Sequence, residues 1–186
     1  FDSYVNEVLG DLINLRKQKK DNQYLRALVF QLYEKNGVIK RSEIDNIVKL
    51  IPAEERKKLW GMGIKIGRYH VYLPKMLKPK AVEFRVSLWK IYHNLKEKHE
   101  IPKSGLNFII NKNYEKNFLL LCGFEKFKDF FIRIDILEKL FIKILDNSKD
   151  RKFKINSEMM NLLGCTKENL YKLMAYMDYK KDKAED

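Results

Sequence analysis

Apolar residues recur at helical spacing in the first part of the chain. Between residues 24 and 36 they fall at positions i, i+3, i+4, i+7 and i+8. These residues are Leu25, Leu28, Val29, Leu32 and Tyr33. This spacing places them on one face of an α-helix, and Gly37 follows as a C-terminal stop. The pattern therefore predicts an amphipathic helix over residues 24–36.

Two shorter helices are expected next. Ser42 can cap the first of them through its hydroxyl. Pro52 suits the start of the second helix, whose early acidic residues complement the positive end of the helix dipole. Gly61 is expected to end this second helix.

Residues 64–73 alternate between apolar and polar side chains, as a β-hairpin does. Gly67 and Arg68 suit a two-residue type II′ turn, which pairs Ile66 with Tyr69 and Lys65 with His70. The alternation then defines a core face and an open face. The core face holds Ile64, Ile66, Tyr69, Val71 and Leu73, and the open face holds Lys65, His70 and Tyr72.

A longer helix is predicted from Lys80, fading near His99. Its apolar side is expected to carry Ala81, Phe84, Leu88, Ile91 and Leu95. Residues 100–112 lack a periodic pattern and are interpreted as a linker. The chain is therefore expected to comprise a helical segment with a basic hairpin (1–99), a linker (100–112) and a small helical unit (113–186).

The last third of the chain predicts three helices with a common core. Asp135 and Glu138 have the spacing of a capping box, Ser157 can cap a short helix that stops at Gly164, and Thr166 can cap the last helix. A helix, a three-residue turn with glycine and a second helix have helix-turn-helix spacing. The shared core is expected to contain Ile136, Leu140, Ile144, Leu162, Leu170 and Leu173. The predicted fold is mainly α with a short β-hairpin and minor strands, ending in this helix-turn-helix-like unit.

Charge is distributed unevenly along the chain, whose net charge is +13. The 27 residues between Glu55 and Glu83 contain no acid and eight bases, where about three or four acids would be expected from overall composition. Such a segment attracts nucleic-acid phosphates. The candidate phosphate contacts are Lys65, Arg68, His70, Lys75, Lys78 and Lys80, with Tyr72 as a possible stacking face. The total charge is weaker evidence for nucleic-acid binding, because 30 of the 38 basic residues are lysine. Codon bias in an AT-rich genome would also produce such a high lysine content.

Motifs for self-contained catalysis are absent from the sequence. No phosphate-binding loop, serine-nucleophile motif or metal-ligand spacing is present. The two cysteines support neither a disulfide framework nor a zinc site, and no apolar run reaches the roughly 18–20 residues needed to span a bilayer. We therefore expect a non-enzymatic, cytoplasmic chain with no cofactor or metal of its own and no membrane partner.

Two sequence blocks carry a family resemblance. The block from Gly63 to Ala81, continuing through Arg85 to Trp89, resembles the region C-terminal to the motor in bacterial relatives of the mitochondrial degradosome helicase. The block from Leu162 to Leu170, continuing to Tyr179, resembles the closing segment of the same family. The likeness covers roughly residues 24–180, and the lysine-rich stretch after Trp89 departs from it.

The resemblance implies a parent protein that is an ATP-dependent superfamily 2 helicase acting on RNA or DNA. ATP and Mg²⁺ would bind to motor domains upstream, and this chain would be a C-terminal accessory region in contact with that motor. No catalytic residue of the family carries over onto these positions.

Three functions are compatible with the sequence. The first is a nucleic-acid-binding accessory region that contacts phosphates through the acid-free segment. The alternative for that segment is that Gly67, Pro74 and Pro79 merely shape a loop that packs on the motor. The second is a structural or protein-interaction module that braces the motor or recruits a partner. The third is a regulator that reads a duplex through Lys167 and Lys172 of the last helix.

Overall fold

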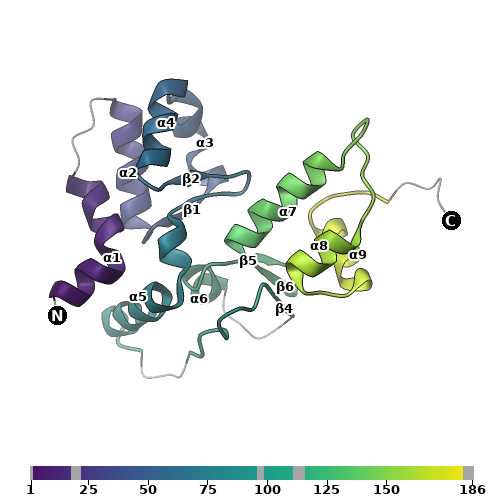
Figure 1. Cartoon of the computed structure of the whole chain (residues 1–186). Coiled ribbons are helices and arrows are strands. Elements are labelled where there is room, and N and C mark those ends of the chain that lie inside the picture. The colour runs from purple at the N-terminus through teal and green to yellow at the C-terminus, as the bar shows by residue number, and fades with distance from the viewer. Residues whose placement is uncertain (1, 18–21, 96–98, 111–115, 182–186) are drawn as a thin grey trace. The chain divides into compact units, whose positions relative to one another are not determined.

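The chain divides into two compact units. The structure, a computed structural model, describes residues 2–17, 22–95, 99–110 and 116–181 (Figure 1). Unit 1 contains residues 1–101 and 121–123, and unit 2 contains residues 102–120 and 124–186. The described residues are mainly helical and form two small antiparallel sheets of three strands each, which confirms the predicted fold class. The division between residues 101 and 102 falls within the range interpreted as a linker, but part of that range forms a strand of unit 2.

Unit 1 packs helices around a three-stranded sheet of order β1-β3-β2 (Figure 1). Its described elements are α1 (Asp2–Lys17), α2 (Gln23–Glu34), β1 (Val38–Lys40), α3 (Arg41–Leu50), α4 (Ala53–Gly61), β2 (Lys65–Ile66), β3 (His70–Tyr72), the 3₁₀ helix η1 (Pro74–Leu77) and α5 (Pro79–Tyr92).

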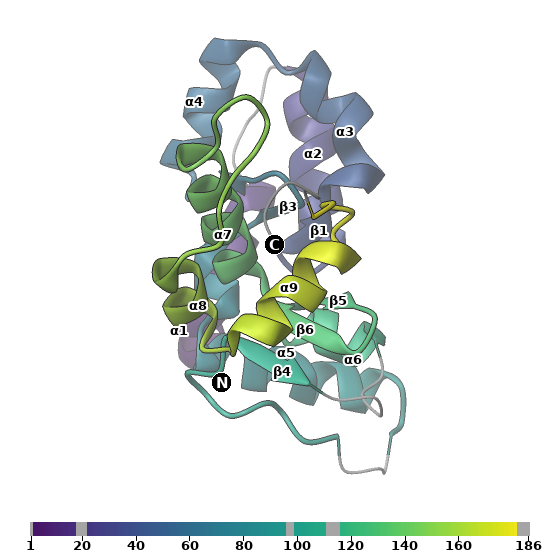
Figure 2. The ribbon, with the colours of Figure 1, turned by 90° about the vertical axis from the view of Figure 1, so that its right-hand side faces the viewer.

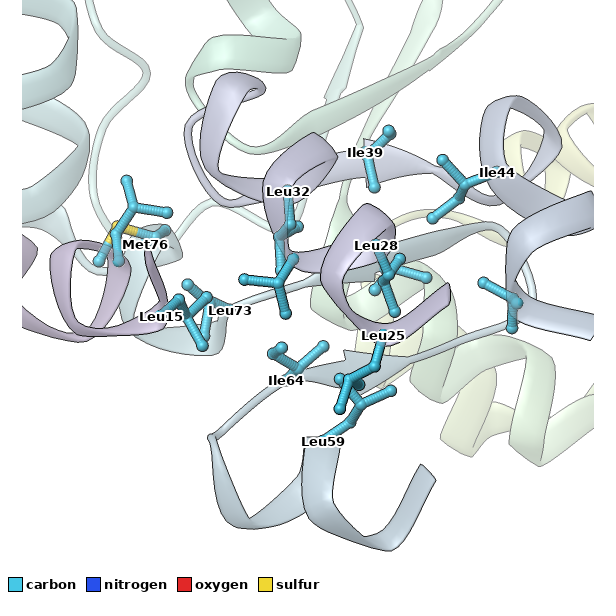
Figure 3. Close-up of a cluster of buried hydrophobic side chains, with 14 of the residues drawn as sticks. Leu15, Leu25, Leu28, Leu32, Ile39, Ile44, Leu59, Ile64, Leu73 and Met76 are labelled. Carbon is cyan, nitrogen blue, oxygen red and sulfur yellow. The ribbon is translucent and has the colours of Figure 1, made fainter. Parts of the chain in front are cut away.

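The core of unit 1 is built around the predicted apolar face of α2. Leu25, Leu28 and Leu32 are fully buried against side chains from the neighbouring helices and sheet (Figure 3). Helix α1 also contributes to this core, although it was not predicted. Its buried residues follow helical spacing and comprise Val8, Leu9, Leu12 and Leu15.

The ends of the next two helices differ in part from prediction. Ser42 does not cap α3, because this helix begins at Arg41, directly after β1. Helix α4 ends at Gly61, as predicted, but the turn that terminates it extends two residues further. Gly63 has a left-handed backbone (φ +79°), and Ile64 N–H donates to the Leu59 carbonyl at 3.0 Å. This is a Schellman ending, which also brings Ile64 onto Leu59 in the core.

The hairpin register is shifted from the predicted one. Ile66 pairs with Val71, and Lys65 pairs with Tyr72. Gly67 N–H donates to the His70 carbonyl at 2.8 Å, so the two residues at the tip are Arg68 and Tyr69. Because the shift moves each pair by two residues, Ile64, Val71 and Leu73 still face the core. Tyr69 leaves the predicted core face and becomes part of the turn.

The face predicted to be open is closed along β3. His70 is 1% exposed and Tyr72 is 7% exposed. Strand β3 is central rather than an edge, because β1 pairs with its other side and aligns Val38 with Tyr72. Each side chain of β3 therefore has neighbours from strands on both sides, whereas Lys65 lies on the edge strand β2 and is exposed.

Helix α5 buries only part of the predicted face. Ala81 is buried and Phe84 packs against the core, but Leu88 and Ile91 are exposed, and Ile91 is 73% exposed. The buried residues include Arg85, which periodicity assigns to the polar side. They are Ala81, Val82, Arg85 and Val86. The helix ends at Tyr92, earlier than the predicted fading near His99.

Unit 2 combines a second three-stranded sheet, of order β4-β6-β5, with helices. The end of α9 contacts β6, where the rings of Tyr176 and Phe130 are 5.3 Å apart. Figure 2 shows both elements of this unit. The described elements assigned to this part of the chain are β4 (Phe108–Ile110), α6 (Lys116–Leu121), β5 (Phe124–Phe127), β6 (Phe130–Arg133), α7 (Ile134–Asp146), α8 (Ser157–Leu163) and α9 (Lys167–Tyr176), of which the last residue of α6 belongs to unit 1.

The predicted core of the last third is largely confirmed. Leu162 is half-buried, and its neighbour Leu163 occupies the core instead. The other five predicted residues are buried: Ile136, Leu140, Ile144, Leu170 and Leu173.

Helix termini in unit 2 were predicted with mixed success. Thr166 caps α9 by accepting the Asn169 N–H at 3.3 Å, as predicted, and Gly164 ends α8 in a left-handed conformation. Asn156, rather than Ser157, caps α8. The predicted capping box is absent, because α7 begins directly after β6 and Asp135 accepts hydrogen bonds from the Arg133 guanidinium.

Candidate nucleic-acid interface

The acid-free segment, residues 56–82, contains no acidic residue, but acidic side chains from elsewhere in the chain contact it. Lys75 forms an ion pair with Asp11, with 2.9 Å between Nζ and Oδ2, and Lys80 forms one with Glu7 at 3.2 Å. Both carboxylates come from α1, more than 60 residues earlier in the chain. These two lysines are exposed, but their charges already have counterions. A phosphate would have to compete with the carboxylates for them.

Three bases at the start of the segment also have intramolecular partners. The Arg56 guanidinium donates to the Ile51 carbonyl at 3.0 Å and so satisfies the C-terminal end of α3. Within α4, the ammonium groups of Lys57 and Lys58 pair with the preceding acids Glu54 and Glu55. Their positive charges are thus largely balanced within the helix.

The hairpin tip has a different environment. Lys65 and Arg68 are exposed, on β2 and on the turn respectively. Arg41 holds the turn in place, because its guanidinium donates to the Gly67 carbonyl at 3.0 Å and its backbone N–H donates to the Tyr69 carbonyl at 2.7 Å. The Arg41 side chain is itself fixed by Asp45 at 2.9 Å. The basic tip is therefore presented on a braced turn.

The remaining predicted contacts separate into two groups. Lys78 is exposed at the start of α5, where it can reach an external phosphate. His70 and Tyr72 are buried on the central strand, so their predicted roles in phosphate contact and base stacking do not fit the structure. The alternation within the hairpin could not reveal that β3 is the central strand of the sheet, with β1 paired on its other side.

Positive charge is concentrated in the part of the chain that carries the hairpin. Residues 1–101 contain 21 basic and 12 acidic residues, a net charge of +9, whereas residues 102–186 contain 17 and 13, a net charge of +4. Residues 121–123 add no charge to unit 1. Unit 1 is therefore the more strongly cationic of the two.

Sequence reasoning missed Trp60 as a candidate functional residue. This tryptophan lies in the last turn of α4 and is 66% exposed. Its position three residues after Lys57 places the two side chains on neighbouring parts of the helix surface. The sequence signal was a tryptophan outside the apolar stripe, three residues from a lysine.

The secondary candidates on α9 lie on its surface. The ammonium of Lys172 pairs with Glu168 at 2.6 Å, and this carboxylate raises the pKa of Lys172. Lys167 lies 5.9 Å from the ring centroid of Tyr171. Both lysines thus have partners on their own helix.

Unit 2 presents an unpredicted basic turn between α7 and α8. Lys149 and Lys152 exchange backbone hydrogen bonds of 2.8 Å around Asp150 and Arg151, both of which have positive φ angles. This is the backbone of a type I′ hairpin turn. The sequence offered no glycine or asparagine to indicate it.

The described ranges contain no cluster of three or more histidine, cysteine, aspartate or glutamate side chains that could hold a metal ion. Across the same ranges, no helix is both long and apolar enough to cross a membrane. Comparisons with protein-family models, with curated proteins and with solved structures found no match.

Proposed function

We propose that this chain is a non-catalytic, nucleic-acid-binding accessory region of a cytoplasmic ATP-dependent helicase. The observation that carries the proposal is the exposed pair Lys65 and Arg68, presented on a turn braced by Arg41. The concentration of positive charge in unit 1 supports it. The helicase parent rests on the sequence resemblance alone, which implies that upstream motor domains bind ATP and Mg²⁺.

The mechanism is electrostatic retention of a strand. Each phosphate that a cation neutralises releases condensed counterions into solution, which favours binding with little sequence preference. Lys65 and Arg68 provide the central contacts, and Lys78 adds a further exposed cation. Such a region would hold RNA or DNA near the motor while the motor consumes ATP.

The test compares two double variants that each remove two positive charges from the same segment. Lys65→Ala with Arg68→Ala should weaken binding to a single-stranded RNA or DNA. It should also flatten the slope of log affinity against log salt by about 1.4 units, at about 0.7 per phosphate contact. Lys75→Ala with Lys80→Ala should change the slope by less than half as much, because those lysines pair with α1.

Circular dichroism would verify that both variants are folded before their titrations are compared. An unchanged slope in a folded Lys65/Arg68 variant would contradict the proposed contact surface. Equal slope changes in the two variants would show that net charge, rather than the hairpin, determines binding.

A second candidate function is a module that braces the motor or recruits a protein partner. It is favoured by the exposed apolar residues near the end of α5, where Ile91 and Tyr92 are among the most exposed large hydrophobic side chains of the described residues. If the folded chain binds neither RNA nor DNA at low salt, this function replaces the first. Its own test is loss of motor association when Ile91 and Tyr92 are changed to serine.

A further inference from the structure

Trp60 is an exposed aromatic side chain on a rigid support. The Schellman ending of α4 fixes its backbone, since Gly63 N–H donates to the Trp60 carbonyl at 2.9 Å. Its neighbours Leu59 and Ile64 are fully buried and anchor the turn in the core. Among the described residues, none makes a ring or cation contact with the Trp60 indole. The backbone of Trp60 is thus anchored, and its indole is exposed beside the turn.

The stretch of chain that follows Trp60 contains basic but no acidic residues before Glu83. Lys57 precedes Trp60 by one turn on the exposed side of α4, where it pairs with Glu54. The turn that follows Trp60 leads directly into β2, where Lys65 begins the hairpin. An anionic ligand that reaches the hairpin would therefore pass next to an indole without meeting an acid in this stretch of chain.

We infer that Trp60 is a stacking platform for an unpaired nucleic-acid base, with Lys65 and Arg68 contacting the flanking phosphates. This inference rests on the proposed nucleic-acid-binding function and specifies its ligand as a single strand. Aromatic side chains beside a positively charged path are how proteins bind single strands with little sequence preference, because every base has a stacking face. Trp60 takes the stacking role that the sequence suggested for Tyr72, which is buried.

The geometry favours a single strand over a duplex. Helices α3 and α4 are separated by a two-residue turn and followed by the hairpin, which is the element order of a winged helix-turn-helix. In duplex docking by such a pair, the first residues of the second helix enter the major groove. In α4 those residues include Glu54 and Glu55, whose charges oppose the phosphates. The exposed aromatic and basic side chains, Trp60, Lys65 and Arg68, follow at its other end.

The test uses two strands of equal length and charge, a single-stranded DNA and an abasic strand that has the same backbone without bases. Trp60→Ala should weaken binding to the normal strand by between about 5-fold and 100-fold. It should leave binding to the abasic strand unchanged. The salt dependence should stay the same, because no charge is removed. Trp60→Phe should restore part of the affinity, since phenylalanine retains a stacking ring.

Fluorescence provides an independent measurement. Trp60 and Trp89 are the two tryptophans of the chain, so a Trp89→Phe variant has Trp60 as its sole tryptophan. Trp89 is half-buried and packs against His93 and His99 at ring distances of 5.4 and 5.3 Å. The Trp60 emission should be quenched by the normal strand and unaffected by the abasic strand.

Two outcomes would overturn the inference in different ways. If Trp60→Ala binds the normal strand as the wild type does, stacking is refuted while the phosphate contacts stand, and Trp60 becomes a candidate protein contact. If the wild type binds neither strand, the proposed function fails together with the inference. A preference for duplex over single strand in the same titration would also refute the single-strand assignment.

Discussion

Arg85 places a charged group inside unit 1. It is 3% exposed, and its guanidinium donates to the carbonyls of Asn36, Met76 and Leu121 at 2.8, 2.6 and 3.0 Å. Burial lowers the pKa of this guanidinium to about 10, which leaves it charged at neutral pH. One side chain thus joins three segments that are distant in sequence. Periodicity could not predict this, because an arginine between apolar residues is assigned to the solvent side.

Removing Arg85 should destabilise unit 1. Arg85→Ala leaves three carbonyls without their donor and opens space, so we expect a loss of about 3–5 kcal/mol in a urea titration. Arg85→Lys keeps the charge but not the planar set of donors, and it should recover only part of the loss. If Arg85→Ala reduced the free energy of unfolding by less than about 1 kcal/mol, Arg85 would not be needed to join the three segments.

Cys122, which interacts electrostatically with Arg85, makes the stability of unit 1 depend on pH. Burial raises the pKa of its thiol to about 12, against an ordinary value of 9.0. Above pH 9 the unfolded chain loses this proton while the folded chain keeps it, so stability should fall as pH rises toward 12. Between pH 8 and 10 the wild type should lose about 1 kcal/mol more than Cys122→Ala, measured by denaturant titration at both pH values. Parallel pH profiles would show that the thiol does not contribute.

At the scale of elements, the sequence predicted where helices and turns occur better than where they end. The apolar face of α2 and the core face of the hairpin could be predicted, because local spacing determines them. The end of α4 at Gly61 was predicted correctly, but the left-handed glycine of the terminating turn is Gly63, which lets Ile64 fold back onto Leu59. The candidate site residues His70 and Tyr72 are buried on a strand that pairs with β1, and no local pattern reveals that pairing.

The two glycines at the end of α4 should respond in opposite directions to alanine substitution. Gly63 has φ +79° and the nearest atom to an added Cβ is 3.9 Å away, so Gly63→Ala should cost about 1 kcal/mol from backbone strain alone. Gly61 lies within the helix with open space around it, so Gly61→Ala should stabilise by about 0.5–1 kcal/mol. Thermal denaturation of both variants would show whether each substitution raises or lowers stability. If both changed stability in the same direction, the observed helix end would be refuted.

Helix α9 provides the corresponding test for unit 2. Leu170 is fully buried. Leu170→Ala should therefore reduce the free energy of unfolding by about 2–5 kcal/mol. Tyr171→Ala, at the exposed neighbouring position, should cost less than about 1 kcal/mol. Similar losses for the two variants would mean that the helix packs through another face.

At the scale of the whole molecule, the division into two parts was partly visible in the sequence. Composition and periodicity placed the change near residues 100–112, and the two units separate at residues 101 and 102. The return of residues 121–123 to unit 1 was not predictable, because it depends on one arginine and on close packing. Gly123 has φ +88°, and an added Cβ would lie 2.7 Å from the Leu77 side chain. Larger residues are excluded there by contacts made across 46 positions of sequence.

This return of three residues has a consequence for how the protein is made. During synthesis, residues 1–101 leave the ribosome well before Leu121. Arg85 therefore lacks one of its three hydrogen-bond acceptors until Leu121 has emerged. Unit 1 can collapse early but reaches its final packing only after residue 123 has been synthesised. Expression fragments that stop at residue 101 would reproduce this incompletely packed state of unit 1. Fragments that extend past residue 123 would supply the missing acceptor and the buried cysteine.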